Sequence, residues 1–130
     1  MLYKPVTFQL FVKVEAERLP SPFENLYNHS ATMITHSVFF KLKHSQGSAE
    51  EKTFLNAAIA LSSIPGVVNF QCVNEVSKSN KFDYGLTMEF GDQKSYDDYS
   101  AHPDHVKFVE ELWVKNVEDF LEIDYVKYGV

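Results

Sequence analysis

The sequence predicts an α+β domain of the ferredoxin-like type, a split βαβ arrangement with one antiparallel four-stranded sheet. Two observations carry this prediction: the order of the segments and their periodicity. Beyond residue 34, segments with apolar residues at every second position alternate with segments of helical period, in the order β-α-β-β-α-β. A chain of 130 residues suffices for one such core, and 15% aromatic residues supply its apolar bulk.

Residues 1–34 are expected to form an arm outside this domain, which would then cover residues 35–130. Apolar and polar residues alternate over Thr7–Ala16, a period typical of a strand. The stretch from Leu19 to Thr32 contains two prolines, two asparagines and two serines, and predicts a connecting loop. Such an arm would add a strand to an exposed sheet edge, on its own subunit or across a dimer.

The first half of the domain is predicted as a strand, a helix and a stop. In the strand Thr35–Lys43, every second side chain from His36 to Leu42 lies on one face. Ser48-Ala-Glu-Glu51 is a capping box and predicts the helix start. Its apolar stripe is followed by Ile64-Pro65-Gly66, which ends the helix because proline cannot continue it.

The second half is predicted as a hairpin, two helices and a last strand. Ser95 is expected to cap the first of these helices, and Pro103 suits the first position of the second. In the last strand, Leu121, Ile123 and Tyr125 share one face. The predicted elements are the strands Val67–Val76 and Phe82–Phe90, the helices Ser95–Tyr99 and Pro103–Val114, and the strand Val117–Tyr128.

A sheet with helices on one side leaves its other face uncovered. Phe39 and Phe70 suggest that both faces of the strands carry apolar residues. A second copy of the chain is the simplest cover, and two sheets face to face would form an α+β barrel. We therefore expect a homodimer.

Charge and cysteine content restrict the partners and the compartment. The net charge is −6, and the segment from Glu89 to Asp124 contains eleven acidic residues but only three lysines. Such a surface repels phosphate groups, so nucleic acid and anionic membranes are not expected as partners. Cys72 is the only cysteine and no segment reads as a signal peptide or membrane span, which together predict a cytoplasmic protein.

The string Tyr99-Ser-Ala-His102-Pro-Asp-His105 concentrates proton-handling groups. His105 can be a general base beside the Tyr99 hydroxyl. Alternatively, both side chains hydrogen-bond each other or the backbone and fix the helix against the first strand. His102 suits a helix cap. His102 and His105 also have a spacing that metals use, and His36 could be a third ligand in space. No cysteine or nearby carboxylate pattern completes the set, so we expect no metal.

The domain resembles the stress-responsive A/B barrel family, whose members are dimeric α+β barrels. The resemblance rests on five segments: His36-Ser-Val-Phe-Phe-Lys-Leu-Lys43, Ile64-Pro-Gly-Val67, Tyr84-Gly-Leu-Thr-Met-Glu-Phe90, Tyr99-Ser-Ala-His-Pro-Asp-His-Val106 and Ile123-Asp-Tyr125. It implies the fold and the dimer. Function varies within the family, so the fold does not specify an activity.

The resemblance also implies roles for single residues. Plant members cyclise a linear polyketide without a cofactor, and by analogy His105 would be the base, Tyr99 its hydrogen-bonding partner and His36 the first-strand histidine. These members carry a further tyrosine on the first helix, where this chain has Ala57. A substrate carbonyl would lose one hydrogen-bond donor there.

Two main functions follow. The first is binding of a small apolar or aromatic molecule, without a cofactor. The residues expected to line the ligand cavity are Phe40, Phe54, Leu61, Leu86, His102 and Trp113. The alternative is that the apolar ones simply fill the hydrophobic core. The second is a cofactor-independent cyclase, isomerase or oxygenase that uses His105 and Tyr99 as an acid–base pair. A weaker alternative is assembly into larger oligomers.

Overall fold

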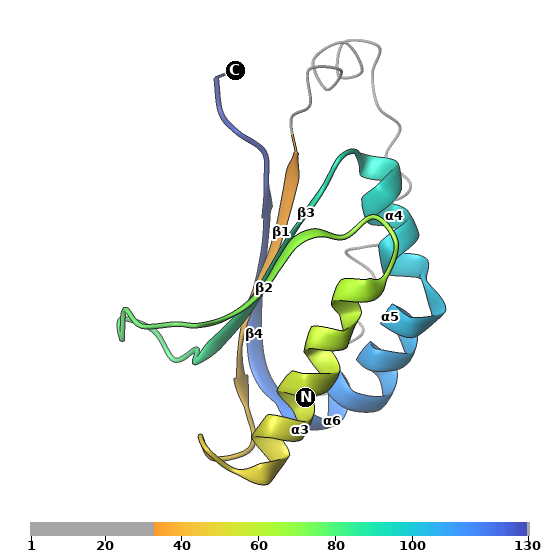
Figure 1. The fold of residues 1–130 in the computed structure, drawn as a ribbon. Helices are drawn as coiled ribbons and strands as arrows, with labels where there is room; N and C mark the ends of the chain where they lie inside the picture. Colours follow the sequence, from red (N-terminus) through yellow and green to blue (C-terminus); the bar gives the residue numbers. More distant parts are fainter. Residues whose placement is uncertain (1–32, 130) are drawn as a thin grey trace.

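A computed structural model describes residues 33–129, and it confirms the ferredoxin-like prediction (Figure 1). Four strands and two helical segments follow in the order β-α-β-β-α-β. The elements are β1 (Ile34–Leu42), α3 (Ala49–Ile59), a 3-10 turn (Ala60–Ser63), β2 (Val68–Asn74), β3 (Tyr84–Phe90), α4 (Gln93–Ala101), α5 (Pro103–Phe108), the π-helical turn η2 (Val109–Trp113), α6 (Val114–Asn116) and β4 (Val117–Tyr125).

The four strands form one sheet in the order β2-β3-β1-β4, with every neighbouring pair antiparallel. β1 therefore lies at the centre, between β3 and β4. Its register places His36 opposite Met88 on one side and opposite Asp124 on the other. The beginning of β1 and the end of β4 thus meet at one end of the sheet.

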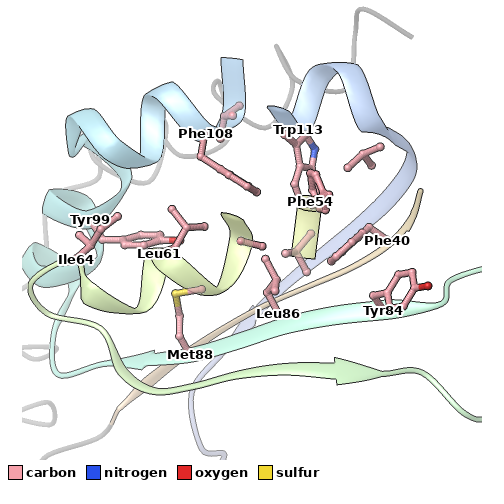
Figure 2. Close-up of a cluster of buried hydrophobic side chains, with 14 of the residues drawn as sticks. Phe40, Phe54, Leu61, Ile64, Tyr84, Leu86, Met88, Tyr99, Phe108 and Trp113 are labelled. Carbon is pink, nitrogen blue, oxygen red and sulfur yellow. The ribbon is translucent and has the colours of Figure 1, made fainter. Parts of the chain in front are cut away.

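All helices of the described region pack on one face of the sheet (Figure 1). Alternating residues of β1 and β3 point toward them and form a single apolar core (Figure 2). Aromatic rings interlock at its centre, with Phe40 lying 5.8 Å from Phe54 and 5.2 Å from Trp113 between ring centroids. Edge-on and tilted ring contacts of this kind add stability beyond apolar burial alone.

The predicted capping box at the start of α3 is half realised. The Ser48 hydroxyl accepts a hydrogen bond from the Glu51 backbone N–H at 3.1 Å, as expected for an N-cap. The Glu51 carboxylate instead accepts from the Gly47 backbone N–H at 2.9 Å, one residue before the cap. Both bonds satisfy backbone donors that the helix itself leaves unpaired.

The start of α4 corrects the sequence prediction. The N-cap is Asp92, not Ser95, and the helix runs over Gln93–Ala101. Asp92 is extended, with φ −158° and ψ 173°, and its carboxylate accepts from the Ser95 backbone N–H at 2.8 Å. Both residue types can cap, but Asp92 lies three residues before Ser95 and only two after the end of β3, so the helix begins earlier than predicted.

The last two predicted elements differ from the structure in detail. The helix that begins at Pro103 is interrupted by the π turn at Val109–Trp113 and continues to Asn116. β4 ends at Tyr125 rather than Tyr128, because Tyr125 pairs with Thr35 at the beginning of β1.

The sheet face opposite the helices is covered by no element of the described region. Three large apolar side chains of β4 are half exposed on it: Leu121, Ile123 and Tyr125. Phe39 also lies on this face, where its ring covers Gly85, and a Cβ added there would come within 2.5 Å of the ring. Phe70 corrects the prediction, because it packs against the helix-side core instead.

Residues 1–32, which include the predicted strand Thr7–Ala16, lie outside the described residues. Ile34, which was expected in the arm, already belongs to β1. Between residues 33 and 129, no helix is both long and apolar enough to cross a membrane.

Candidate functional site

The structure brings together the three residues singled out by the resemblance. His36 lies near the start of β1, Tyr99 in α4 and His105 in α5. All three are almost fully buried, with exposed fractions of 2%, 2% and 4%. The ring centroid of Tyr99 lies 4.7 Å from that of His105 and 6.4 Å from that of His36. Tyr99 therefore stands between the two imidazoles.

The geometry around His105 defines its tautomer. Its Nδ1 lies 2.9 Å from the Ser100 backbone carbonyl oxygen, which can only accept, so Nδ1 carries the hydrogen. Burial lowers the pKa of His105 to about 4, and the backbone hydrogen bond offsets this only in part. The imidazole is therefore neutral at pH 7, with the lone pair on Nε2.

Tyr99 presents a neutral phenol. Burial, reinforced by the negative charge of Glu122, raises its pKa above the ordinary value for tyrosine. Within residues 33–129, its hydroxyl has no hydrogen-bond partner. The hydroxyl can therefore donate a hydrogen bond to an acceptor on a bound molecule.

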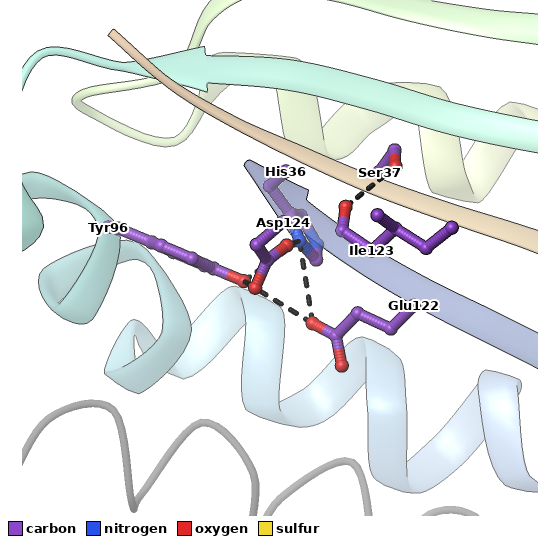
Figure 3. Close-up of polar contacts among 6 residues, drawn as sticks. All are labelled: His36, Ser37, Tyr96, Glu122, Ile123 and Asp124. Atoms are coloured by element: carbon purple, nitrogen blue, oxygen red, sulfur yellow. Dashed lines mark hydrogen bonds and ion pairs between the residues drawn. The ribbon is translucent and has the colours of Figure 1, made fainter. Parts of the chain in front are cut away.

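His36 belongs to a second group of polar side chains, which we call the acidic cluster. Its members are His36, Tyr96, Glu122 and Asp124 (Figure 3). The His36 Nδ1 lies 2.6 Å from Asp124 Oδ1 and 3.4 Å from Glu122 Oε2. The Tyr96 hydroxyl donates to Asp124 Oδ2 at 2.8 Å and lies 2.8 Å from the same His36 nitrogen. Both carboxylates are largely buried, with side chains 7% and 14% exposed.

Tyr96 stays protonated in this cluster. Burial raises its pKa first, and the charges of Glu122 and Asp124 raise it further, because a phenolate would be repelled by both carboxylates. Its ring stacks on Phe90, with the centroids 4.9 Å apart and the planes 5° from parallel. The stack and the hydrogen bond together hold the hydroxyl in place.

The motif and the cluster meet at a small cavity of about 10 Å³, the size of one water molecule. Most of the residues expected to line a ligand pocket surround it or belong to the core beside it. Phe40 and Phe54 are core residues, and Ala57 is partly buried against that core. The side chains that line the cavity include His36, Leu61, Leu86, Met88, Tyr99, His105 and Trp113.

His102 does not line this cavity. It is the N-cap of α5, where its Nδ1 accepts a hydrogen bond from the Asp104 backbone N–H at 3.1 Å. This is the capping role that Pro103 at the next position suggested. The side chain is also one-third exposed, unlike His36 and His105.

The site residues predicted from the sequence do not include Tyr96, Glu122 and Asp124. A signal was present for the two carboxylates, because Glu122 and Asp124 alternate with the apolar residues of the last strand. A side-chain period of two places them on the opposite face, toward the helices. In the split βαβ order the last strand pairs with the first, so Asp124 faces His36. Tyr96 left no such signal.

Residues 34–127 match the family described as Stress responsive A/B Barrel Domain. The chain belongs to this family.

Two comparisons illustrate its relatives. This A/B barrel chain is 26% identical over 96 residues to a stress-response A/B barrel domain-containing protein of Arabidopsis thaliana, covering 72% of this chain and 36% of that protein. The chain thus spans about a third of the length of this relative. A Dabb family protein with a ferredoxin-like fold from Mesorhizobium loti is 49% identical, with a TM-score of 0.73, covering 75% of this chain and 99% of that one.

More distant structures share the fold alone. A dimeric ferredoxin-like protein of unknown function from Bacteroides fragilis is 20% identical, with a TM-score of 0.58, over 73% of this chain and 96% of that one. A hydroxynitrile lyase from Passiflora edulis is 12% identical, with a TM-score of 0.67, over 77% of this chain and 97% of that one.

Proposed function

We propose that this A/B barrel protein binds a small aromatic or apolar molecule that carries one hydrogen-bond acceptor, such as a carbonyl oxygen. The observation that supports this most directly is Tyr99, whose side chain is 2% exposed and whose hydroxyl makes no hydrogen bond within residues 33–129. An acceptor at the cavity would take its hydrogen bond. The apolar residues around it would contact the rest of the molecule.

The ligand must displace side chains, because the cavity itself holds about one water molecule. Met88 and Leu61 are the lining residues best suited to move. Methionine has three rotatable bonds and fits irregular spaces, and Leu61 belongs to a short 3-10 turn rather than to a long helix. A single aromatic ring is therefore the size of ligand that we expect.

We further propose that the chain forms a homodimer through the open face of its sheet. Leu121, Ile123 and Tyr125 are half exposed on a face that no described element covers. Apolar patches of this kind on a folded protein commonly mark an interface. A protein of this fold from Bacteroides fragilis is described as dimeric, which supports self-association. The single cysteine supports a cytoplasmic location.

Catalysis is the second candidate, and the neutral His105 next to Tyr99 favours it. The hydroxynitrile lyase shows that an enzyme can use this fold. His105 keeps its basic form down to a pH of about 4, but a base with so low a pKa has little driving force to remove a proton at neutrality. The geometry therefore supports binding better than acid–base chemistry.

The test is binding of acetophenone, a one-ring ketone, measured by isothermal titration calorimetry. We expect the wild type to bind and Tyr99→Phe to bind about tenfold more weakly, the loss of one hydrogen bond of about 1.4 kcal/mol. Tyr128→Phe is the matched control, because that side chain is 98% exposed. Equal affinity of wild type and Tyr99→Phe would contradict the proposal, as would failure of the wild type to bind. Conversion of the ketone in the same sample would instead indicate an enzyme.

A further inference from the structure

The acidic cluster joins ligand groups that metals use, and of its members only His36 also lines the small cavity beside Tyr99. We propose that His36, Glu122 and Asp124 form a binding site for a divalent first-row transition-metal ion. One nitrogen or oxygen atom from each of these side chains lies within 4.8 Å of the other two. This site does not depend on the proposed ligand at Tyr99.

The distances within the cluster are those of a nearly assembled coordination shell. Ligand atoms at roughly 2.0–2.2 Å from one ion are about 3 Å from each other in octahedral geometry and about 3.4 Å from each other in tetrahedral geometry. The His36 Nδ1 lies 2.6 Å from the Asp124 oxygen and 3.4 Å from the Glu122 oxygen. Small rotations of the two carboxylates would therefore open a position that all three ligands reach.

The backbone holds these ligands in place before any ion binds. Glu122 and Asp124 are two residues apart on β4, so both point to the same face. Backbone register places Asp124 directly opposite His36. On the other face of the same strand pair, the Ser37 hydroxyl donates to the Ile123 carbonyl at 2.7 Å and fixes this register (Figure 3). Sheet positions of this kind give a precise site.

The chemistry of the donor set selects the class of ion. An imidazole nitrogen with two carboxylates suits zinc, iron or manganese, whereas magnesium and calcium prefer oxygen ligands alone. A dication would also interact favourably with the two carboxylates of the cluster. The Tyr96 hydroxyl lies 2.8 Å from Asp124 and 3.3 Å from Glu122, and its single O–H would orient one of these carboxylates through a hydrogen bond.

Titration with Co²⁺ and Zn²⁺ tests this site in the full-length protein after EDTA treatment and dialysis. Cobalt bound by nitrogen and oxygen ligands gives visible absorption bands, and Zn²⁺ should displace them while Mg²⁺ should not. Glu122→Gln and Asp124→Asn keep the side-chain shapes and should each weaken Co²⁺ binding about 100-fold. Glu111→Gln, an exposed carboxylate with the same charge change, and His102→Gln, a partly exposed imidazole, should bind like the wild type.

Location of the ion completes the test. A crystal of the wild type soaked in Zn²⁺ should show anomalous density between His36 and Asp124. This measurement locates the ion even if a variant fails to fold. Three results would overturn the proposal: no cobalt bands in the wild type, unchanged affinity in both cluster variants, or anomalous density only at surface histidines. Acetophenone binding is tested separately by Tyr99→Phe, so failure of the metal site and failure of the ligand site are distinguishable.

Discussion

At the scale of single residues, His105 shows how burial sets the chemistry of the motif. The sequence offers a histidine of ordinary pKa, able to change charge near neutrality. In the folded protein its Nδ1 donates to the Ser100 carbonyl and its ring lies against Tyr99, at 4% exposure. Burial penalises the charged form, so the residue stays neutral through the physiological range.

This neutrality makes stability depend on pH. The pKa of His105 is about 4 in the folded protein, below the ordinary value of 6.5. Between these values the unfolded chain binds a proton that the folded protein does not, so the stabilisation is complete above pH 6.5 and is lost as the pH falls toward 4. From pH 7 to pH 5 the loss from this residue is about 2 kcal/mol.

The measurement is urea unfolding of wild type and His105→Gln at pH 7 and pH 5. We expect the wild type to lose more stability between the two pH values than the variant, because glutamine does not titrate. His102→Gln serves as the control, since this partly exposed residue caps α5 without being buried. Parallel losses in wild type and His105→Gln would show that His105 is protonated in the folded protein.

At the scale of elements, the helix ends and the strand pairing place the site. Tyr96 and Tyr99 sit one turn apart on α4, and the start of that helix decides which way they point. Asp92 defines this start with its hydrogen bond to the Ser95 backbone N–H. A shift of the helix would turn the Tyr96 hydroxyl away from His36 and Asp124 and would move the Tyr99 ring away from His105, so a surface cap controls a buried site.

Asp92→Ala should therefore destabilise the protein by about 1 kcal/mol, the usual value of an N-cap. Asp98→Ala is the control, because it removes the same charge from the same helix at an exposed position where the ion pair with Lys94 adds little. Urea unfolding at pH 7 compares the two. If both variants lose the same small amount, Asp92 does not act as a cap in solution.

At the scale of the whole molecule, the sheet determines how the protein assembles. Its helix side is closed by the core, and its open side exposes Leu121, Ile123 and Tyr125. Gly85 leaves the space that the Phe39 ring occupies on this open side. The ring can thus lie flat on the sheet, a shape suited to a second sheet packing against it.

Leu121→Asp should convert the proposed homodimer to a monomer. In a two-fold dimer each substitution acts twice, so we expect the dimer dissociation constant to rise at least about 100-fold. Light scattering after size-exclusion chromatography measures the mass. Ile59→Asp is the matched control, since Ile59 is 44% exposed on α3 and Leu121 is 50% exposed on β4. A wild type that is monomeric, or a Leu121→Asp variant that stays dimeric, would contradict the open-face dimer.

Much of this molecule follows from local sequence. Strand and helix periods predict the four strands, the helices and their order, and short motifs predict the caps at Ser48 and His102. The family resemblance predicts that His36, Tyr99 and His105 come together, and they do. These features depend on side-chain period, backbone preference and motif, which neighbouring residues carry.

Tertiary structure decided the rest. The acidic cluster exists because β4 pairs with β1 in a register that joins residues 88 positions apart, and no local pattern carries that register. The neutral state of His105 and the small cavity likewise arise from packing, because burial depends on what the chain places around a residue. Local sequence determined which elements form, and long-range contact determined which groups meet and in what protonation state.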